Sequence, residues 1–160
     1  MSIEIDQQAP NFTLYNTERK EISLQDLTSK SNVVLLFFPL AFTAVCTTEL
    51  CSTRDDISIF ENLNATVIAI SVDSLFSLGK FRQENEIPFD LLSDFNKEIS
   101  RKYDSLYEDF PLLALKGVTK RSAFIIDKQG IIRYAEILVD PTKLPDFDKI
   151  KEILDNFNKS

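Results

Sequence analysis

Two cysteines, five residues apart, are the side chains of this chain with the most evident chemistry. Cys46 closes the segment 39–46, which follows an apolar run typical of a strand and opens a run typical of a helix. Backbone N–H groups and the helix dipole at such a helix start favour a thiolate over a thiol. Because the thiolate is the nucleophilic form of cysteine, we expect this chain to react through Cys46.

The chain contains no histidine, and this narrows the chemistry open to Cys46. A hydrolase of the papain type relies on histidine as the base that activates its cysteine, so such hydrolysis is disfavoured. Histidine is also the commonest zinc ligand, and two cysteines without it supply too few soft ligands for a zinc ion or an iron–sulfur cluster within one chain. We therefore expect a thiol mechanism that requires no metal and no organic cofactor.

The size and charge of the chain favour one soluble domain. Its 160 residues, 44% of them hydrophobic, fit a single domain over 1–160. The net charge of −7 disfavours nucleic acid and anionic membranes as partners, since both select for basic surfaces. Residues 1–6 show no signal-peptide pattern, and the longest apolar run, 33–38, is too short to span a bilayer. We expect a cytoplasmic protein whose cysteines are free or redox-active.

The apolar pattern along the chain predicts a mixed order of strands and helices. Strands are predicted at 9–15 and 21–24, which form a hairpin, and at 33–38, 66–72, 88–94, 121–127 and 131–136. Helices are predicted at 43–63, 74–86, 96–103 and 145–157, with a long loop over 104–120. This order predicts an α/β chain that resembles a thioredoxin-like fold, with a mixed β-sheet flanked by helices and an N-terminal β extension. A Rossmann-type fold is disfavoured, because the three glycines form no phosphate-binding loop.

Two motifs carry a resemblance to a known family. Segment 39–46 has the form P-x-x-x-T-x-x-C, and 121–124 has the form R-x-x-F. Both resemble the active site of peroxiredoxins, and the similarity extends from 9–12 through 91–94 to 130–133, most of the chain. The resemblance implies a peroxidase whose Cys46 thiolate attacks a hydroperoxide and becomes a sulfenic acid.

The same resemblance implies roles for three residues around Cys46. Arg121 is expected beside the thiolate, Thr43 is expected to hydrogen-bond to the thiol or the peroxide, and Pro39 is expected to shield the thiolate from water. Each residue also has a plainer interpretation. Cys46 could be a small core residue and Arg121 a surface arginine, while Pro39 could simply end a strand and Thr43 cap a helix.

Cys51 follows Cys46 in the form C-T-x-E-x-C. This resembles the bacterioferritin-comigratory, or peroxiredoxin Q, group, and implies that Cys51 resolves the Cys46 sulfenic acid as an intramolecular disulfide. On one helix the two Cα atoms lie roughly 8–9 Å apart, so such a bond requires local unwinding. Residues 39–43 look more like the alkyl hydroperoxide reductase E group, which implies a one-cysteine peroxidase with Cys51 as an inert packing residue.

The resemblance also implies partners. A disulfide within the subunit suits reduction by thioredoxin or a similar dithiol protein, and a homodimer is possible. Five apolar residues could form a patch for an organic hydroperoxide or a partner subunit, or could pack in the core: Phe42, Phe76, Tyr107, Phe110 and Leu112. General thiol–disulfide exchange is disfavoured by the missing C-x-x-C, and a non-catalytic peroxide sensor or holdase is the alternative from another class.

Overall fold

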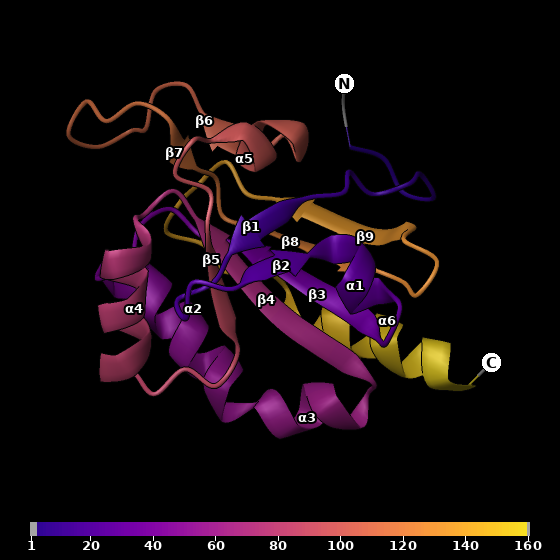
Figure 1. Ribbon diagram of the computed structural model, residues 1–160. Helices are drawn as coiled ribbons and strands as arrows, with labels where there is room; N and C mark the ends of the chain where they lie inside the picture. The colour runs from indigo at the N-terminus through magenta and orange to yellow at the C-terminus, as the bar shows by residue number, and fades with distance from the viewer. Residues whose placement is uncertain (1–2, 160) are drawn as a thin grey trace.

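The computed structural model describes residues 3–159, so the ends of the expected domain, Met1, Ser2 and Ser160, lie outside the described residues. Its centre is a five-stranded sheet in the order β5-β4-β3-β8-β9 (Figure 1). These strands are β3 Asn32–Phe37, β4 Ala65–Ser71, β5 Asp90–Ser93, β8 Ser122–Ile126 and β9 Ile132–Ile137. β3 pairs parallel with β4 and antiparallel with β8, so the sheet is mixed, as the sequence predicts.

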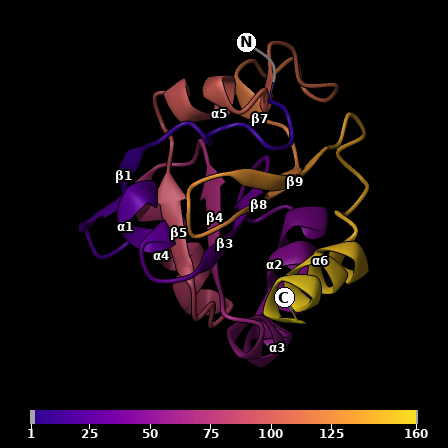
Figure 2. The ribbon, with the colours of Figure 1, turned by 90° about the vertical axis from the view of Figure 1, so that its right-hand side faces the viewer.

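Helices cover both faces of this sheet. They are α1 Leu24–Thr28, α2 Ala44–Asp55, α3 Ile57–Asn62, α4 Leu75–Glu84, α5 Glu98–Lys102 and α6 Phe147–Lys159. One core includes Leu50, Phe60 and Leu154, so α2, α3 and α6 share a face, while Leu24 of α1 and Ile99 of α5 belong to the core on the other face. Figure 2 shows α2, α3 and α6 on one side of the sheet and α1 on the opposite side. The predicted α/β class with a thioredoxin-like arrangement is confirmed.

The strand β3 occupies the centre because it is apolar after its first residue and buried along its whole length. The chain leaves β3, forms α2 and α3, and returns as the parallel strand β4, so this part of the chain is a βαβ unit. Parallel neighbours end at the same edge of a sheet, so the segment after β3 and the segment after β4 lie near each other. The start of α2 lies at this edge.

One predicted helix is two helices. The expected helix over 43–63 is interrupted at Asp56, whose φ of −100° and ψ of 10° are not helical, so α2 and α3 are separate. Aspartate has a low helix propensity because its short carboxylate competes for backbone groups, and here the Asp56 carboxylate accepts a hydrogen bond from Lys151 of α6 at 2.8 Å. The segment contains neither Gly nor Pro, so its pattern gave no sign of the break.

The expected long loop over 104–120 is wrong in part. Two short strands, β6 Leu106–Tyr107 and β7 Val118–Thr119, pair antiparallel within it. Strands of two residues are too short to show an alternating pattern, which is why the sequence does not reveal them. Gly117, with a φ of +72°, lies directly before β7 in a conformation that glycine adopts without strain.

The sequence analysis missed the short helix α1, but the other remaining elements follow the predictions closely. β1 Thr13–Tyr15 and β2 Glu21–Ser23 form the N-terminal hairpin, although β1 is shorter than expected. Ser74 is the N-cap of α4, and its side chain accepts a hydrogen bond from the Ser77 N–H. Between residues 3 and 159, none of the helices has both the length and the apolar character needed to cross a bilayer.

Candidate active site

Cys46 is the third residue of α2, as predicted, and is 1% exposed. The loop 38–43 connects the end of β3 to this helix, and Phe38 donates its backbone N–H to the Ile70 carbonyl of β4 at 3.0 Å. The start of α2 is therefore attached to the carboxyl edge of the sheet. A cysteine in the first turn has backbone N–H groups and the positive end of the helix dipole close to it, which favours negative charge on sulfur.

Arg121 supplies the cation that the resemblance implies. It directly precedes β8, and the antiparallel register that places Phe37 opposite Ser122 brings it to the end of β3, next to α2. Its Nη2 donates to the Cys46 Sγ at 3.2 Å, and the residue is 1% exposed. The structure thus brings Arg121 and Cys46 together from positions 75 residues apart. The interpretation of Arg121 as a surface residue is wrong.

Glu49 is a site residue that the sequence reasoning did not single out. It is fully buried, and its Oε1 accepts from the Arg121 Nη1 at 2.5 Å. Residues three apart share a helix face, so Glu49 and Cys46 both face the guanidinium. Burial raises the pKa of Glu49 to about 7, although the Arg121 charge and hydrogen bond lower it. The C-T-x-E-x-C form contained this glutamate, and its spacing from Cys46 is the signal that could have revealed it.

The guanidinium is confined on a further side by the segment after β9. Its Nη2 also donates to the Pro141 carbonyl at 3.0 Å, and the Leu138 N–H donates to the Arg121 carbonyl at 2.9 Å. Tyr107 of β6 donates its hydroxyl to the Val139 carbonyl at 2.5 Å. Burial lowers the pKa of Arg121, but the nearby Glu49 and Cys46 together raise it by more. The net direction is therefore upward, and the group stays cationic.

Thr43 and Pro39 lie in the loop that leads to Cys46. Thr43 occupies the N-cap position of α2, but its Oγ1 donates to the Leu40 carbonyl at 2.7 Å and makes no side-chain cap. The residue is exposed. Pro39 is buried. The contact of Thr43 in this structure is with its own loop.

Cys51 faces a different part of the molecule from Cys46. Its Sγ lies 3.6 Å from the Asn85 Oδ1 at the end of α4, and Arg54 donates to the Asn85 carbonyl at 2.6 Å. Both cysteines are free, and Cys51 is partly exposed. The helix α2 is continuous through both, so the two thiols are separated by a rotation of about 140° and cannot bond while it stays intact.

The five apolar residues considered for a surface patch are divided between surface and core. Phe42, Phe76 and Leu112 are 53%, 76% and 60% exposed, whereas Tyr107 is 7% exposed. Phe110 is partly buried, and its ring packs edge-on against Tyr107 at 5.3 Å. For Tyr107 the core interpretation is therefore the right one.

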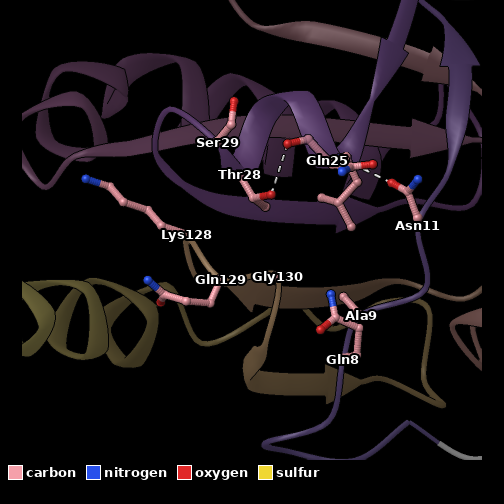
Figure 3. Close-up of a pocket in the computed structure, with 10 residues that line it drawn as sticks. Gln8, Ala9, Asn11, Gln25, Thr28, Ser29, Lys128, Gln129 and Gly130 are labelled. Atoms are coloured by element: carbon pink, nitrogen blue, oxygen red, sulfur yellow. Dashed lines mark hydrogen bonds between the residues drawn. The ribbon is translucent and has the colours of Figure 1, made fainter.

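A hollow on the surface lies apart from the cysteines (Figure 3). Its lining comes from the N-terminal segment, from α1 and from the turn between β8 and β9: Gln8, Ala9, Asn11, Leu24, Gln25, Thr28, Ser29, Lys128, Gln129 and Gly130. No residue of the loop 38–43 or of α2 takes part. Within residues 3–159, the structure has no group of three or more Cys, Asp or Glu side chains placed to hold a metal ion.

The arrangement around Cys46 suits nucleophilic attack by sulfur. A buried guanidinium in contact with a sulfur stabilises the thiolate and any negative charge that develops on a bound atom next to it. Glu49 orients that guanidinium and balances its charge, which a buried arginine requires. Such a site favours a small, neutral electrophile that accepts two electrons from sulfur.

Comparison with known proteins agrees with this chemistry. Residues 5–135 match the model of the AhpC/TSA family. The chain is 40% identical over 147 residues to the chloroplastic 2-cysteine peroxiredoxin of Chattonella marina var. antiqua, covering 86% of this chain and 72% of that protein. It is 36% identical over 131 residues to the alkyl hydroperoxide reductase E of Mycobacterium tuberculosis, covering 81% and 82%.

A solved structure gives the same result for the fold. The peroxidoxin BcpB of Mycobacterium tuberculosis superposes with a TM-score of 0.85 and 25% identity, covering 96% of this chain and 97% of that one. The predicted likeness to both the bacterioferritin-comigratory and the alkyl hydroperoxide reductase E groups is confirmed by these relatives. With the matched family over most of its length and a cysteine–arginine pair at the helix start, the chain belongs to the AhpC/TSA family and is a thiol-dependent peroxidase of the peroxiredoxin kind.

Proposed function

We propose that the chain reduces hydrogen peroxide and organic hydroperoxides with Cys46 as the attacking group. The observation that supports this most directly is the 3.2 Å hydrogen bond from the Arg121 Nη2 to the Cys46 Sγ. The thiolate attacks the terminal oxygen of the peroxide, an S–O bond forms, and the O–O bond breaks. The leaving oxygen takes a proton and departs as water or an alcohol, while sulfur is oxidised to a sulfenic acid.

The other residues of the site have supporting roles in this proposal. Arg121 stabilises the charge that passes along the O–O bond, and Glu49 holds Arg121 in place. Thr43 turns its hydroxyl from the Leu40 carbonyl toward the bound peroxide and donates to it. Pro39 keeps water from the sulfur. Each role is compatible with the burial and contacts of the residue in the resting structure.

We further propose that Cys51 resolves the sulfenic acid. The Cys51 thiol attacks the Cys46 sulfur, water leaves, and an intramolecular disulfide forms, which thioredoxin or a similar dithiol protein then reduces by exchange. The partial exposure of Cys51 supports this role, because a thiol that reacts by exchange must be accessible. The helix α2 must unwind between the two cysteines for this step.

A one-cysteine peroxidase is the second candidate. The observation in its favour is the intact α2, in which Cys51 packs toward Asn85 and away from Cys46. In that case an external thiol reduces the sulfenic acid directly.

We also propose a reducing compartment such as the cytoplasm, where two free cysteines persist. We further propose a homodimer whose interface covers the exposed side chains of Phe42 and Phe76.

The test compares wild type with Cys46→Ser and Cys51→Ser. Peroxide consumption is followed with a thioredoxin system, and the intact mass of each oxidised protein is measured by mass spectrometry. We expect no turnover for Cys46→Ser, little turnover for Cys51→Ser, and a mass loss of two hydrogens only in wild type. Normal turnover of Cys51→Ser would favour the one-cysteine mechanism. A wild type that consumes no peroxide would overturn the proposed substrate class.

A further inference from the structure

The loop that leads to Cys46 contains a strained residue. Phe42 has a φ of +66°, a conformation that a bulky residue adopts only when its surroundings impose it. Thr43 and the first turn of α2 follow directly. The ring of Phe42 packs edge-on against Phe81 at 5.3 Å, but it remains 53% exposed, so this contact encloses only part of the side chain. To hold Phe42 in this conformation, the loop backbone needs a stronger restraint than the contact between the two rings.

Asp73 supplies such a restraint from the segment that follows β4. Its Oδ2 accepts a hydrogen bond from the Ala41 N–H at 2.8 Å, in the residue directly before Phe42. The same oxygen accepts from the hydroxyl of the buried Ser71 at 2.6 Å, and the Asp73 carbonyl accepts from the Ser93 hydroxyl at 2.6 Å. Asp73 is thereby attached to both β4 and β5. Hydrogen bonds to a carboxylate are stronger than those between neutral groups.

We propose that Asp73 is a positioning residue for the reaction of Cys46. Its bond to Ala41 holds the loop in the strained turn from which α2 begins at Ala44, and this helix start places the Cys46 sulfur against Arg121. The inference rests on the proposed function of Cys46 and adds a residue to it that does not touch the reacting atoms.

The same bond opposes the unwinding that a Cys46–Cys51 disulfide requires. When the Ala41 N–H loses its acceptor, the turn at Phe42 relaxes and the first turn of α2 frays, which moves Cys46 away from Arg121. The loss of Asp73 therefore has two effects of opposite sign. The attack on peroxide becomes slower, and the formation of the internal disulfide from the sulfenic acid becomes faster. A general loss of folding would also unwind α2, so faster disulfide formation points to Asp73 only where the amide exchange of β8 stays unchanged.

The test uses Asp73→Ala and Asp73→Asn, with Asp94→Ala as the matched control. Asp94 also follows a strand end, and its carboxylate accepts from the Ile99 N–H, from the Ser100 N–H at 2.6 Å and from the Ser100 hydroxyl, none of which belongs to the loop before Cys46. For Asp73→Ala we expect a second-order rate constant with hydrogen peroxide at least about tenfold below wild type. Asp73→Asn keeps an acceptor oxygen and should stay within about threefold. Asp94→Ala should lose stability but react at the wild-type rate.

Two further measurements separate positioning from unfolding. Amide hydrogen exchange should accelerate over 41–50 in Asp73→Ala, with unchanged exchange in β8. In the double variant D73A/F42N, asparagine tolerates the positive φ, so the rate with peroxide should recover severalfold over D73A. Wild-type rates and wild-type exchange in Asp73→Ala would overturn the inference. If wild type itself fails to react with peroxide, the proposed function fails, but the exchange result still decides the role of Asp73.

Discussion

Glu49 and Arg121 form a buried ion pair in which one guanidinium nitrogen, Nη1, is held at 2.5 Å while the other, Nη2, contacts the Cys46 sulfur. Arginine has two such nitrogens in a fixed fork, so fixing one of them orients the other. A buried ion pair loses hydration from both partners and contributes little net stability. We infer that this pair is kept for the orientation of Nη2, which the reaction at sulfur requires.

The first prediction concerns Arg121→Lys. Lysine keeps the charge but cannot contact Glu49 and Cys46 at once, and it lacks the planar fork. If one oriented donor contributes about 3–4 kcal/mol to the transition state, as in acyl transfer, the rate constant with hydrogen peroxide should fall by at least about 100-fold. Stopped-flow competition kinetics measure this. Arg133→Lys is the control and should react at the wild-type rate. Arg133 pairs with Asp127, with 2.7 Å between Nε and Oδ2, and not with a cysteine.

The second prediction concerns the pH dependence of stability. The folded pKa of Glu49 is raised to about 7 from 4.5, chiefly by burial, so the folded state binds a proton more tightly than the unfolded state. The contribution of this group is fully present below about pH 4.5 and is lost as the pH rises through about 7. The free energy of unfolding should therefore decline across this window, by at most roughly 1.4 kcal/mol per pH unit.

Glu49→Gln tests that dependence, because glutamine cannot titrate. Urea midpoints measured from pH 5 to pH 8 should decline for wild type and change less for the variant. The control is Glu152→Gln, which removes a carboxylate that is 62% exposed in its pair with Lys149. An identical pH slope for wild type and Glu49→Gln would show that other groups determine it.

The chemistry at Cys46 was predictable from sequence, but its electrostatic environment was predictable only in part. The two motifs predicted Cys46 and Arg121, but the antiparallel pairing of β3 with β8 that brings them together is seen only in the structure. The role of Glu49 was not predicted, because a glutamate in the first turns of a helix is usually solvated. Only the tertiary contact with Arg121 explains its burial. The bond between Asp73 and Ala41 joins two loops, and no periodic pattern records such a contact.

The errors in the predicted elements have a common physical origin. The break at Asp56 and the strands β6 and β7 depend on single hydrogen bonds and on two-residue pairings, which leave no periodic trace. Long buried strands such as β3 and amphipathic helices such as α6 show a clear pattern of apolar residues in the sequence. The segment that carries function here, 38–43, lies between such elements and adopts its shape through contacts with β4.

The third prediction concerns Leu50, which lies on α2 between the two cysteines. It is fully buried in the core that α2 shares with α3 and α6, so Leu50→Ala should reduce the free energy of unfolding by about 2–5 kcal/mol. Because the same contacts hold α2 in place, amide exchange of the helix should also accelerate. Urea denaturation and hydrogen exchange measure both effects. Leu144→Ala is the control, since that side chain is 38% exposed and should cost much less.

The fourth prediction concerns Tyr107→Phe. The Tyr107 hydroxyl donates to the Val139 carbonyl at 2.5 Å and so restrains the segment whose Pro141 carbonyl accepts from Arg121. Burial and the nearby Asp140 raise the pKa of Tyr107, so the hydroxyl keeps its proton throughout the neutral range. Loss of this one hydrogen bond should reduce stability by about 1 kcal/mol. It should also slow the reaction with peroxide severalfold, because the guanidinium loses a fixed acceptor.

Tyr134→Phe is the matched control for that change, since Tyr134 donates to Glu136 within β9, and it should leave the rate with peroxide unchanged. Both variants are compared at the same fraction folded, which denaturation curves provide. A severalfold decrease confined to Tyr107→Phe would mean that the segment after β9 acts on Cys46 through Arg121. Equal rates for both variants would mean that Glu49 alone is sufficient to orient the guanidinium, and that the bond to Pro141 only fastens the segment to the core.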